Sequence, residues 1–397
     1  MKQAVLAVNI GSSTLKFAVY PMHDHHVDAS ILNGNISGLE PNGKAEISWS
    51  MGDRHIEEDL VNTTHDDPFH VALDFLRQLL VNNLSDTKIL AVAHRVVHGG
   101  TQYSAGVIVN DEIMTNLSTL EPLAPLHQPH NIEGIKVFSS FFKDIPQVAC
   151  FDTSFHTTIP DVERCFALPL EMAKEGIYRY GFHGLSYQYV SGRLAKKSSA
   201  ARGKLLMAHL GNGSSLCGAI GSKSVASSMG FSAVDGLMMG TRCGNLDPGV
   251  LLYLLQNGWD AQKIQTLIYK NSGLKGVSGI SADMRTLRAS ESQEAKFAID
   301  MYTHRVIKES GAMVACMEGL DAIAFTGGIG EHDAILRNQV CLSMTYLGII
   351  LDPEANRQAT GDAIVPIHDP RSRVQVWVVP TDEGRIAAEE AMRLLRL

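Results

Sequence analysis

Several motifs that would assign a function at once are missing from this chain of 397 residues. It has no Gly-x-x-x-x-Gly-Lys-Ser/Thr loop, no Gly-x-Gly-x-x-Gly fingerprint and no Gly-x-Ser-x-Gly elbow. These absences argue against a P-loop nucleotidase, a dinucleotide-binding domain and a serine hydrolase. The six cysteines contain no Cys-x-x-Cys pair, so we expect free thiols rather than disulfides or a zinc site.

Blocks of like charge and long apolar runs are also missing. Acidic residues outnumber basic ones, 42 against 34, and no dense basic block occurs, which argues against a nucleic-acid or membrane-surface partner. No apolar run approaches the roughly 20 residues that cross a bilayer, and no small-residue cleavage site follows the start. We therefore expect a cytoplasmic globular protein of two or three domains.

One pattern is present twice, half the chain apart. An apolar run that ends in a polar residue, a turn of glycine and hydroxyl residues and a second apolar run occupy residues 6–20 and again 206–220. Asn9 closes the first run and His209 closes the second, whose turn we expect to be one residue longer. Glycine lets backbone N–H groups approach an anion, so each copy predicts a phosphate-binding turn. A single copy would more simply be an ordinary β-hairpin, but the repetition favours a duplicated domain.

Charged residues stand at the ends of other apolar strands. Arg95 precedes a Gly-Gly turn, Asp152 follows the run at 147–151, and Glu383 follows the last apolar run. Open α/β sheets place ligand groups at such strand ends, although Arg95 could also form a surface salt bridge. Aspartate at this position is common in phosphoryl-transfer enzymes.

Glycine-rich loops in the second half complete the set. His183 lies between glycines ahead of a predicted helix, and Arg242 lies in a dense glycine loop. Residues 327–331 read Gly-Gly-Ile-Gly-Glu at a strand-to-helix junction, where backbone can approach a flat or anionic ligand. These loops indicate an anionic ligand, although flexible surface loops have a similar composition.

With these motifs assembled, the chain resembles the acetate kinases of the acetate and sugar kinase, heat-shock ATPase and actin superfamily. The resemblance runs from residue 5 to residue 388, and its motifs occur in the family's order at residues 8–16, 94–100, 180–184, 209–213, 240–242, 327–331 and 381–383. It implies an α/β fold of two duplicated ribonuclease-H-like (actin-like ATPase) domains with a nucleotide cleft between them. The implied domains are residues 1–151 with 385–397 and residues 152–384, and the implied assembly is a homodimer.

The resemblance also implies roles for single residues. Asn9 and Glu383 would hold Mg²⁺, with Mn²⁺ as an alternative, and Lys16 would help to bind the ATP phosphates. Arg95 would pair with the substrate carboxylate or the moving phosphoryl group, while Asp152 would act as a base or as an orienting group.

Two further groups complete the implied site. His183 and Arg242 would stabilise the transition state. The residues expected to contact the phosphates and adenosine of ATP or ADP are His209, Leu210, Gly211, Asn212, Gly213, Asp283, Met284, Arg285, Gly327, Gly328, Ile329, Gly330 and Glu331.

The implied pocket for the acid is small and apolar, formed by Val97, Leu126 and Phe182. Val97 favours acetate, because a smaller residue there would leave room for another methylene, worth about 1–3 kcal/mol of discrimination. The chain departs from the family at two positions: Ala233 stands where proline is commoner, and Gly384 stands where many relatives carry a second glutamate.

The implied reaction is the reversible, Mg²⁺-dependent transfer of the γ-phosphoryl group of ATP to acetate, which gives acetyl phosphate and ADP. A carboxylate is already a nucleophile, so this transfer needs in-line placement and positive charge more than proton abstraction. The alternatives are a propionate or butyrate kinase, an ATP-hydrolysing binding module of the actin or chaperone type, and an acid-anhydride hydrolase. In the hydrolase, Arg95 and the apolar pocket would have no purpose.

Overall fold

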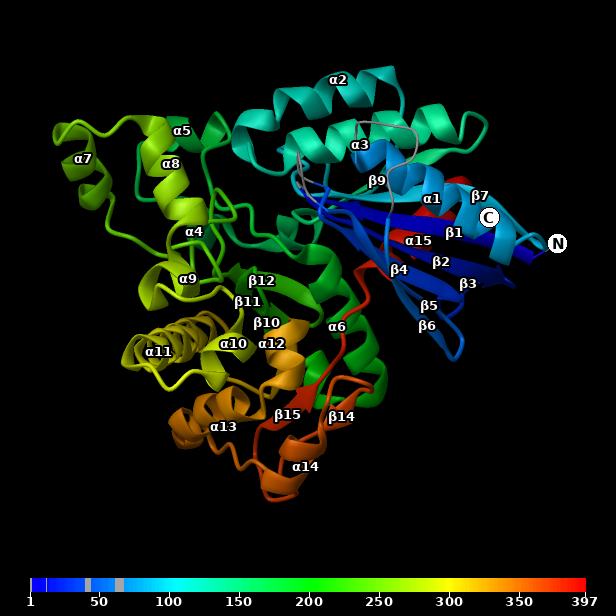
Figure 1. Cartoon of the computed structure of the whole chain (residues 1–397). Helices are drawn as coiled ribbons and strands as arrows, with labels where there is room; N and C mark the ends of the chain where they lie inside the picture. Colours follow the sequence, from blue (N-terminus) through cyan, green and yellow to red (C-terminus); the bar gives the residue numbers. More distant parts are fainter. Residues whose placement is uncertain (1, 12, 40–43, 61–67) are drawn as a thin grey trace. The chain divides into compact units, whose positions relative to one another are not determined.

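Two compact units make up the structure, a computed structural model that describes residues 2–11, 13–39, 44–60 and 68–397 (Figure 1). The first unit comprises Met1–Ser154 with Asp382–Leu397, and the second comprises Phe155–Thr381. This division differs from the expected one because Asp152 and Glu383 belong to the first unit. Ser12, part of the first predicted turn, lies outside the described residues.

The first unit contains a nine-stranded sheet with the order β6-β5-β4-β2-β1-β7-β9-β8, in which β3 pairs with β2. Its strands are β1 (Lys2–Ile10), β2 (Leu15–His23), β3 (His26–Val27), β4 (Leu32–Ser37), β5 (Glu46–Met51), β6 (Arg54–Asp59), β7 (Thr87–Val96), β8 (Val107–Ile108) and β9 (Gln147–Phe151). The central strands β1, β7 and β9 run parallel to one another. Parallel strands buried on both faces are continuous apolar runs, as seen in β1 and β9.

Helices cover both faces of this sheet. They are α1 (Pro68–Asn83), α2 (Asp111–Thr119), α3 (Gln128–Phe141) and α15 (Glu383–Leu395), with the short 3-10 helix η1 (Glu121–Leu123). Leu73 and Leu76 of α1 pack with Leu6 of β1 in one buried cluster. The C-terminal helix α15, red in Figure 1, packs against β1 and β7. The chain therefore returns to the first sheet after completing the second unit.

The second unit contains a six-stranded sheet with the order β12-β11-β10-β13-β15-β14. Its strands are β10 (Lys204–Leu210), β11 (Ser214–Ile220), β12 (Lys223–Ser227), β13 (Ala322–Thr326), β14 (Val365–Pro366) and β15 (Gln375–Val378). Its helices are α4 (Asp161–Arg164), α5 (Leu170–Lys174), α6 (Gly184–Lys197), α7 (Pro248–Gln256), α8 (Ala261–Lys270), α9 (Gly273–Ser278), α10 (Met284–Ala289), α11 (Gln293–Cys316), α12 (Gly327–His332), α13 (Ala334–Ser343) and α14 (Pro353–Gln358). The short 3-10 helices are η2 (Ser154–Thr158), which crosses the unit boundary, η3 (Ala200–Arg202) and η4 (Thr345–Leu347).

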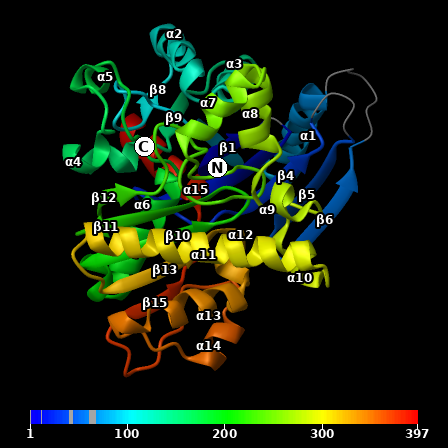
Figure 2. The same cartoon turned by 90° about the vertical axis from the view of Figure 1, so that its left-hand side faces the viewer.

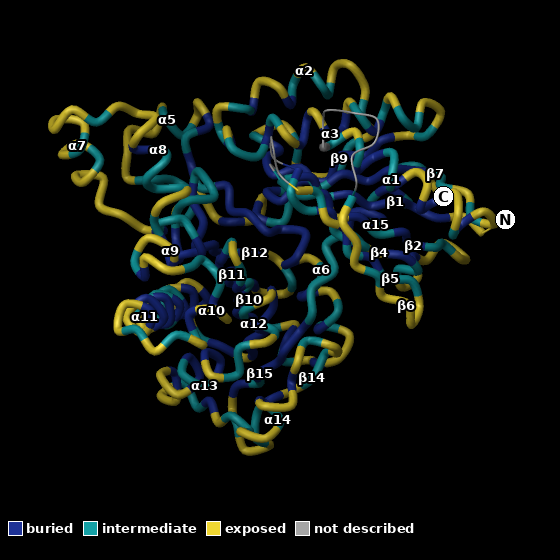
Figure 3. The backbone as a smooth tube through the Cα atoms, in the orientation of Figure 1, coloured by how far each residue is buried: buried dark blue, intermediate teal, exposed yellow. Residues whose placement is uncertain are grey.

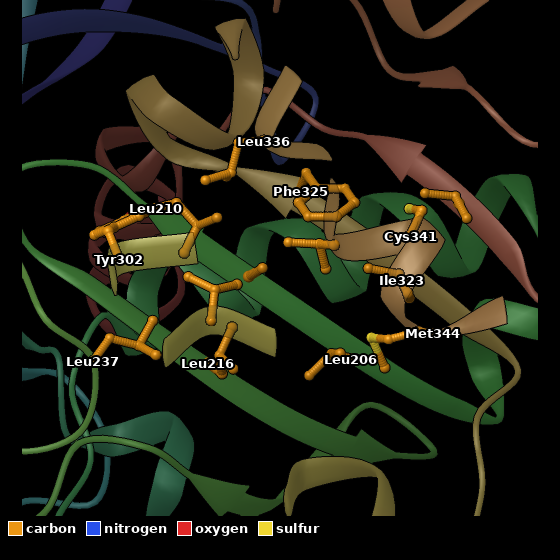
Figure 4. Close-up of a cluster of buried hydrophobic side chains, with 14 of the residues drawn as sticks. Leu206, Leu210, Leu216, Leu237, Tyr302, Ile323, Phe325, Leu336, Cys341 and Met344 are labelled. Carbon is orange, nitrogen blue, oxygen red and sulfur yellow. The ribbon is translucent and has the colours of Figure 1, made fainter. Parts of the chain in front are cut away.

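The second sheet has two apolar faces that follow the period of two along β10. Leu206 and Leu210 join the cluster formed with α11 and α13 (Figures 2 and 4), whereas Leu205 and Met207 face the cluster that contains Tyr187 of α6. The strands are buried along most of their length (Figure 3). None of the described helices combines the length and apolar character of a membrane span.

The two units share one topology. Strands β4-β2-β1-β7-β9 of the first sheet and β12-β11-β10-β13-β15 of the second have the same order, the same antiparallel hairpins and the same parallel pairs. The predicted duplicated α/β fold is therefore confirmed.

The expected lengths of the two turns were wrong. The first hairpin closes at the pair Ile10 and Leu15, the second at the pair Leu210 and Ser214, so the second turn is the shorter one. Ser214 belongs to the strand and its hydroxyl bonds back to the carbonyl of Gly211 at 2.8 Å. A hydroxyl side chain near a glycine therefore closed the turn instead of lengthening it.

Candidate active site

Arg95 lies at the centre of a charged cluster in the first unit. Its Nε donates to Asp152 Oδ1 at 2.9 Å and its Nη2 donates to Asp152 Oδ2 at 2.5 Å. Its Nη1 donates to Asn9 Oδ1 at 3.2 Å, and Glu383 Oε2 lies 3.5 Å from its Nε. We call these four residues, which come from four separate segments of the sequence, the Arg95 cluster.

The central strands explain this convergence. Asn9, Arg95 and Asp152 stand at or just beyond the carboxyl ends of β1, β7 and β9, which are parallel neighbours, so all three side chains reach the same edge of the sheet. Glu383 comes from the first turn of α15, whose N-cap Asp382 accepts a hydrogen bond from the Tyr20 hydroxyl at 2.5 Å. Glu383 thus begins a helix instead of ending a strand.

Burial distinguishes this cluster from a surface salt bridge. The Asp152 side chain is 1% exposed and the Arg95 side chain 20% exposed. Although burial opposes its charge, Asp152 and Glu383 raise the pKa of Arg95, so the guanidinium stays cationic. The surface salt bridge that the sequence left open for Arg95 is therefore excluded.

The same cluster supplies oxygen ligands. Among the described residues, no group of three His, Cys, Asp or Glu side chains is arranged to hold a metal ion. Mg²⁺ in kinases is typically bound by one or two carboxylates together with waters and substrate phosphates. The carboxylate of Glu383 and the amide oxygen of Asn9 are oxygen donors of the kind that fit such a Mg²⁺ site.

The loop after β7 is fixed by residues that the sequence did not single out. Asn131 of α3 accepts from the Val97 N–H at 3.0 Å and donates to the Ile10 carbonyl at 2.8 Å. Val97 is buried and Leu126 is half-buried. Lys16, exposed on β2, is paired with Asn9 across the first hairpin.

In the second unit, the shorter turn lies against a histidine and an arginine. A Cβ placed on Gly213 would stand 3.3 Å from His183 Nε2 and 3.8 Å from Arg242 Nη1. The space above this glycine is thus bordered by two nitrogen-bearing side chains that can bind a phosphate oxygen. Arg242 is oriented by a hydrogen bond from its Nη1 to the Ala233 carbonyl at 2.9 Å.

The other glycine loops reach the same turn. A Cβ on Gly240 would stand 2.0 Å from Asn212 Oδ1, and one on Gly211 would stand 3.8 Å from the Gly328 nitrogen. Gly327 has a φ of +75° and its Cβ position lies 2.7 Å from the Leu210 carbonyl, a close approach that only glycine tolerates. Three loops that are distant in sequence therefore meet around the second hairpin.

Buried hydrogen bonds hold His183 and Phe182. His183 is the N-cap of α6 in the left-handed region, with φ +57°, and its Nδ1 lies 2.9 Å from Ser215 Oγ. Phe182 is buried, and its carbonyl accepts from His156 Nε2 at 2.9 Å. Burial lowers the pKa of His156 to about 4, so its ring is neutral at pH 7.

The residues assigned to adenosine have mixed environments. Asp283 caps α10 and pairs with Arg285, whose side chain is 91% exposed, while Met284 belongs to the core. The Glu331 carboxylate accepts from the Gly327 N–H at 2.8 Å and from the Thr381 N–H at 3.1 Å. It therefore ties the ends of β13 and β15 together, a role the sequence did not reveal.

The two units share one topology. The first carries the Arg95 cluster, and the second carries glycine loops beside a histidine and an arginine. Together these features define a two-domain α/β phosphotransferase. A family model described as the Acetokinase family matches residues 4–389. The chain belongs to the acetokinase family, which confirms the resemblance seen in the sequence.

Relatives match the chain over its whole length. The acetate kinase of Rhodopseudomonas palustris (strain ATCC BAA-98 / CGA009) is 43% identical over 399 residues, which cover 99% of each chain. That of Methylocella silvestris is 44% identical over 410 residues, which cover 100% of this chain and 98% of the relative.

Solved structures of an acetate kinase and of a propionate kinase resemble this chain. The acetate kinase of Porphyromonas gingivalis has a TM-score of 0.85 at 35% identity and covers 99% of this chain and 100% of its own. A propionate kinase of Francisella tularensis has a TM-score of 0.87 at 35% identity and covers 98% of each chain.

Proposed function

We propose that this protein transfers the γ-phosphoryl group of ATP reversibly to acetate and forms acetyl phosphate and ADP. Membership of the acetokinase family over nearly the whole chain supports this activity. The observation that carries the proposal is the Arg95 cluster, in which a partly buried arginine is held by both oxygens of the buried Asp152. A hydrolase would have no use for this arginine as a carboxylate partner.

In this proposal the Arg95 cluster acts on the acid. Arg95 attracts the acetate carboxylate, and Asp152 orients Arg95 instead of acting as a base. Both Asp152 oxygens already accept hydrogen bonds from Arg95, and the nucleophile arrives ionised, so no proton has to be removed. Val97, Leu126 and Phe182 provide the apolar surroundings of the methyl group.

The glycine loops of the second unit act on the nucleotide. The turn at residues 211–213 lines the phosphate oxygens, while Arg242 supplies positive charge and His183 a hydrogen bond to the transferred group. The ion pair between Asp283 and the exposed Arg285 contacts adenosine. The loop 327–331 contacts adenosine as well.

Mg²⁺ would be held by Asn9 and Glu383, and Lys16 would contribute to phosphate binding. When bound, the metal supplies positive charge to the phosphate oxygens. The oxygen donors of the Arg95 cluster support this assignment, and Mn²⁺ is the alternative ion because it prefers the same ligands.

Hydroxylamine trapping of the acyl phosphate tests the activity directly. The protein is incubated with ATP and Mg²⁺, and with acetate, propionate, butyrate or no acid. We expect acetyl hydroxamate to form with the highest kcat/KM and propionyl hydroxamate to form more slowly. A higher kcat/KM for propionate or butyrate would replace acetate as the proposed substrate. ATP hydrolysis that is unaffected by any acid would favour the actin-like binding module.

We also propose that the protein is a homodimer that associates through α7. This helix has no buried residue (Figure 3). Its apolar residues Val250, Leu252, Tyr253 and Leu255 are all exposed. Exposed apolar side chains gathered on one short element are typical of an interface. Light scattering should show a dimer that Leu252→Glu converts to a monomer, while Val162→Glu, at a residue 92% exposed on α4, leaves the dimer intact.

We propose that the protein is located in the cytoplasm. All six cysteines are free, which agrees with a reducing compartment. Fractionation of cells that produce the protein at native levels would check this location.

A further inference from the structure

Two histidines of the second unit form a stacked pair. The rings of His183 and His209 have centroids 4.2 Å apart and planes inclined by 20°. His183 caps α6, and His209 is near the end of β10. Two imidazolium ions at this separation repel each other strongly, so at least one ring of the pair is neutral. Neutral imidazole carries its proton on one nitrogen, and the partner of the other nitrogen decides which.

A chain of hydroxyl groups meets His183 at Nδ1. Ser215 Oγ lies 2.9 Å from this nitrogen, and the Tyr187 hydroxyl bonds the same Ser215 oxygen. Burial raises the pKa of Tyr187 well above its usual value, so the phenol keeps its proton.

These contacts fix the direction in which the hydroxyl groups donate their protons. Ser215 Oγ is the acceptor that the described residues offer to the buried Tyr187 hydroxyl, so the Tyr187 proton goes to Ser215, because a buried hydroxyl without an acceptor is costly. Ser215 has a single proton, which is then directed to His183 Nδ1. His183 therefore accepts at Nδ1 and carries its proton on Nε2.

A second chain of the same kind meets His209. Thr381 Oγ1 donates to Ser186 Oγ at 2.8 Å, and Ser186 Oγ lies 2.8 Å from His209 Nδ1. Ser186 thus directs its proton to His209 in the way that Ser215 does to His183. Two serines from different elements, one on α6 and one on β11, each act on one ring of the stack.

The Nε2 atom of His183 faces the second turn. This nitrogen faces the space above Gly213, which Arg242 also borders. We propose that Ser215 and Ser186 are positioning residues that hold His183 and His209 as neutral Nε2–H tautomers, so that His183 donates a hydrogen bond to the transferred phosphoryl group. That a phosphoryl group accepts this hydrogen bond rests on the proposed function. The assignment of the two tautomers does not depend on the proposed function.

The tautomers can be measured without any activity. Two-bond ¹H–¹⁵N spectra of the full chain labelled at histidine distinguish protonated from unprotonated ring nitrogens, and His183→Gln and His209→Gln assign the signals. We expect Nε2–H and unprotonated Nδ1 for both rings. Ser215→Ala should alter the signals of His183, and Ser186→Ala those of His209. An Nδ1–H tautomer for His183 in the unmodified protein would overturn the proposal.

Kinetics test the positioning role. Ser215→Ala should lower kcat about ten- to a hundredfold with less than a twofold change in the KM for ATP, Ser215→Thr should recover most of kcat, and Tyr187→Phe should lower it less. Ser191→Ala is the matched control, because the buried Ser191 hydroxyl donates to the Tyr187 carbonyl at 2.7 Å instead of to a ring. Equal kcat values for Ser215→Ala and Ser191→Ala would reject the role. If the unmodified protein makes no acyl phosphate, the proposed function is wrong. The spectra would still show which tautomers the two histidines adopt.

Discussion

The two hairpins have the same strand order and different chemistry. In the first unit the first strand of the hairpin ends beside Asn9, whose amide oxygen accepts from Arg95, and the neighbouring strand ends carry Arg95 and Asp152. In the second unit the hairpin ends beside His209, stacked on His183, and the neighbouring loops carry glycines and hydroxyl groups.

This difference shows how one topology provides two kinds of binding group. The carboxyl ends of parallel strands are positions where side chains leave the sheet without disturbing its hydrogen bonds, so their residue types are free to vary. In the proposed function, charge at the first edge selects a small ionised partner. Glycines and hydrogen-bond donors at the second edge would admit phosphate oxygens.

The largest expected effect is on the first unit. Asp152→Ala leaves the partly buried Arg95 without its bidentate partner, so we expect kcat to fall at least about a hundredfold and the free energy of unfolding to fall by about 3 kcal/mol. Acyl hydroxamate assays and urea unfolding measure the two quantities. Asp86→Ala, at an exposed partner of Lys2 in the same unit, should change neither. Wild-type kcat in Asp152→Ala would remove the Arg95 cluster from the reaction.

The second unit should respond in kcat alone. Arg242→Ala removes a cation used mainly in the transition state, so kcat should fall about a hundredfold while the KM for ATP changes less than about threefold. Arg371→Ala removes an arginine paired with Asp369 on the surface and serves as the control. A variant in which KM rises and kcat stays constant would assign Arg242 to ground-state binding.

Acid should destabilise both units through buried histidines. Burial lowers the pKa of His94 in the first unit and of His156 in the second to about 4, from 6.5. The unfolded chain therefore binds more protons than the folded one below pH 6.5, and stability falls as the pH drops from 6.5 to 4, by about 3 kcal/mol for each ring.

The free energy of unfolding measured across this pH range checks the sign. His156→Gln or His94→Gln should flatten the pH dependence, and His304→Gln, at an exposed histidine, should leave it unchanged. Stability that rises toward pH 4 would contradict the neutral, buried state of these rings.

Matching glycine substitutions compare the two turns directly. Gly213→Ala places a methyl group 3.3 Å from His183 Nε2, whereas Gly11→Ala places one 3.2 Å from Thr14 Oγ1 of its own turn. We expect kcat to fall about tenfold for Gly213→Ala, equivalent to about 1.4 kcal/mol, and to fall less for Gly11→Ala. Equal losses in steady-state assays would mean that the two turns have equivalent roles.

The smallest effect concerns the size of the acid. Val97→Ala enlarges the apolar surroundings of the methyl group, so the ratio of kcat/KM for propionate to that for acetate should rise by up to about tenfold. Val81→Ala, at an exposed valine of α1, should leave this ratio unchanged. An unaltered ratio in Val97→Ala would place the acid elsewhere.

The sequence alone determined the duplicated α/β fold and the acetokinase family. Apolar runs that end in Asn9, Arg95 and Asp152 mark strand ends by local pattern, and the repeated glycine and hydroxyl turn marks the duplication. These features depend on neighbours along the chain, so they can be recognised without coordinates.

Only the tertiary structure decided which side chains meet. Asn131 fixes the loop of Val97, Ser215 contacts His183, and Thr381 bonds Ser186 from a position 195 residues away. Serine, threonine and asparagine are common throughout the chain, and nothing in their local sequence distinguishes a buried partner from a solvated one. Their roles arise from packing between elements that are distant in sequence, which brings each hydroxyl or amide to one particular acceptor and excludes the water that would otherwise replace it.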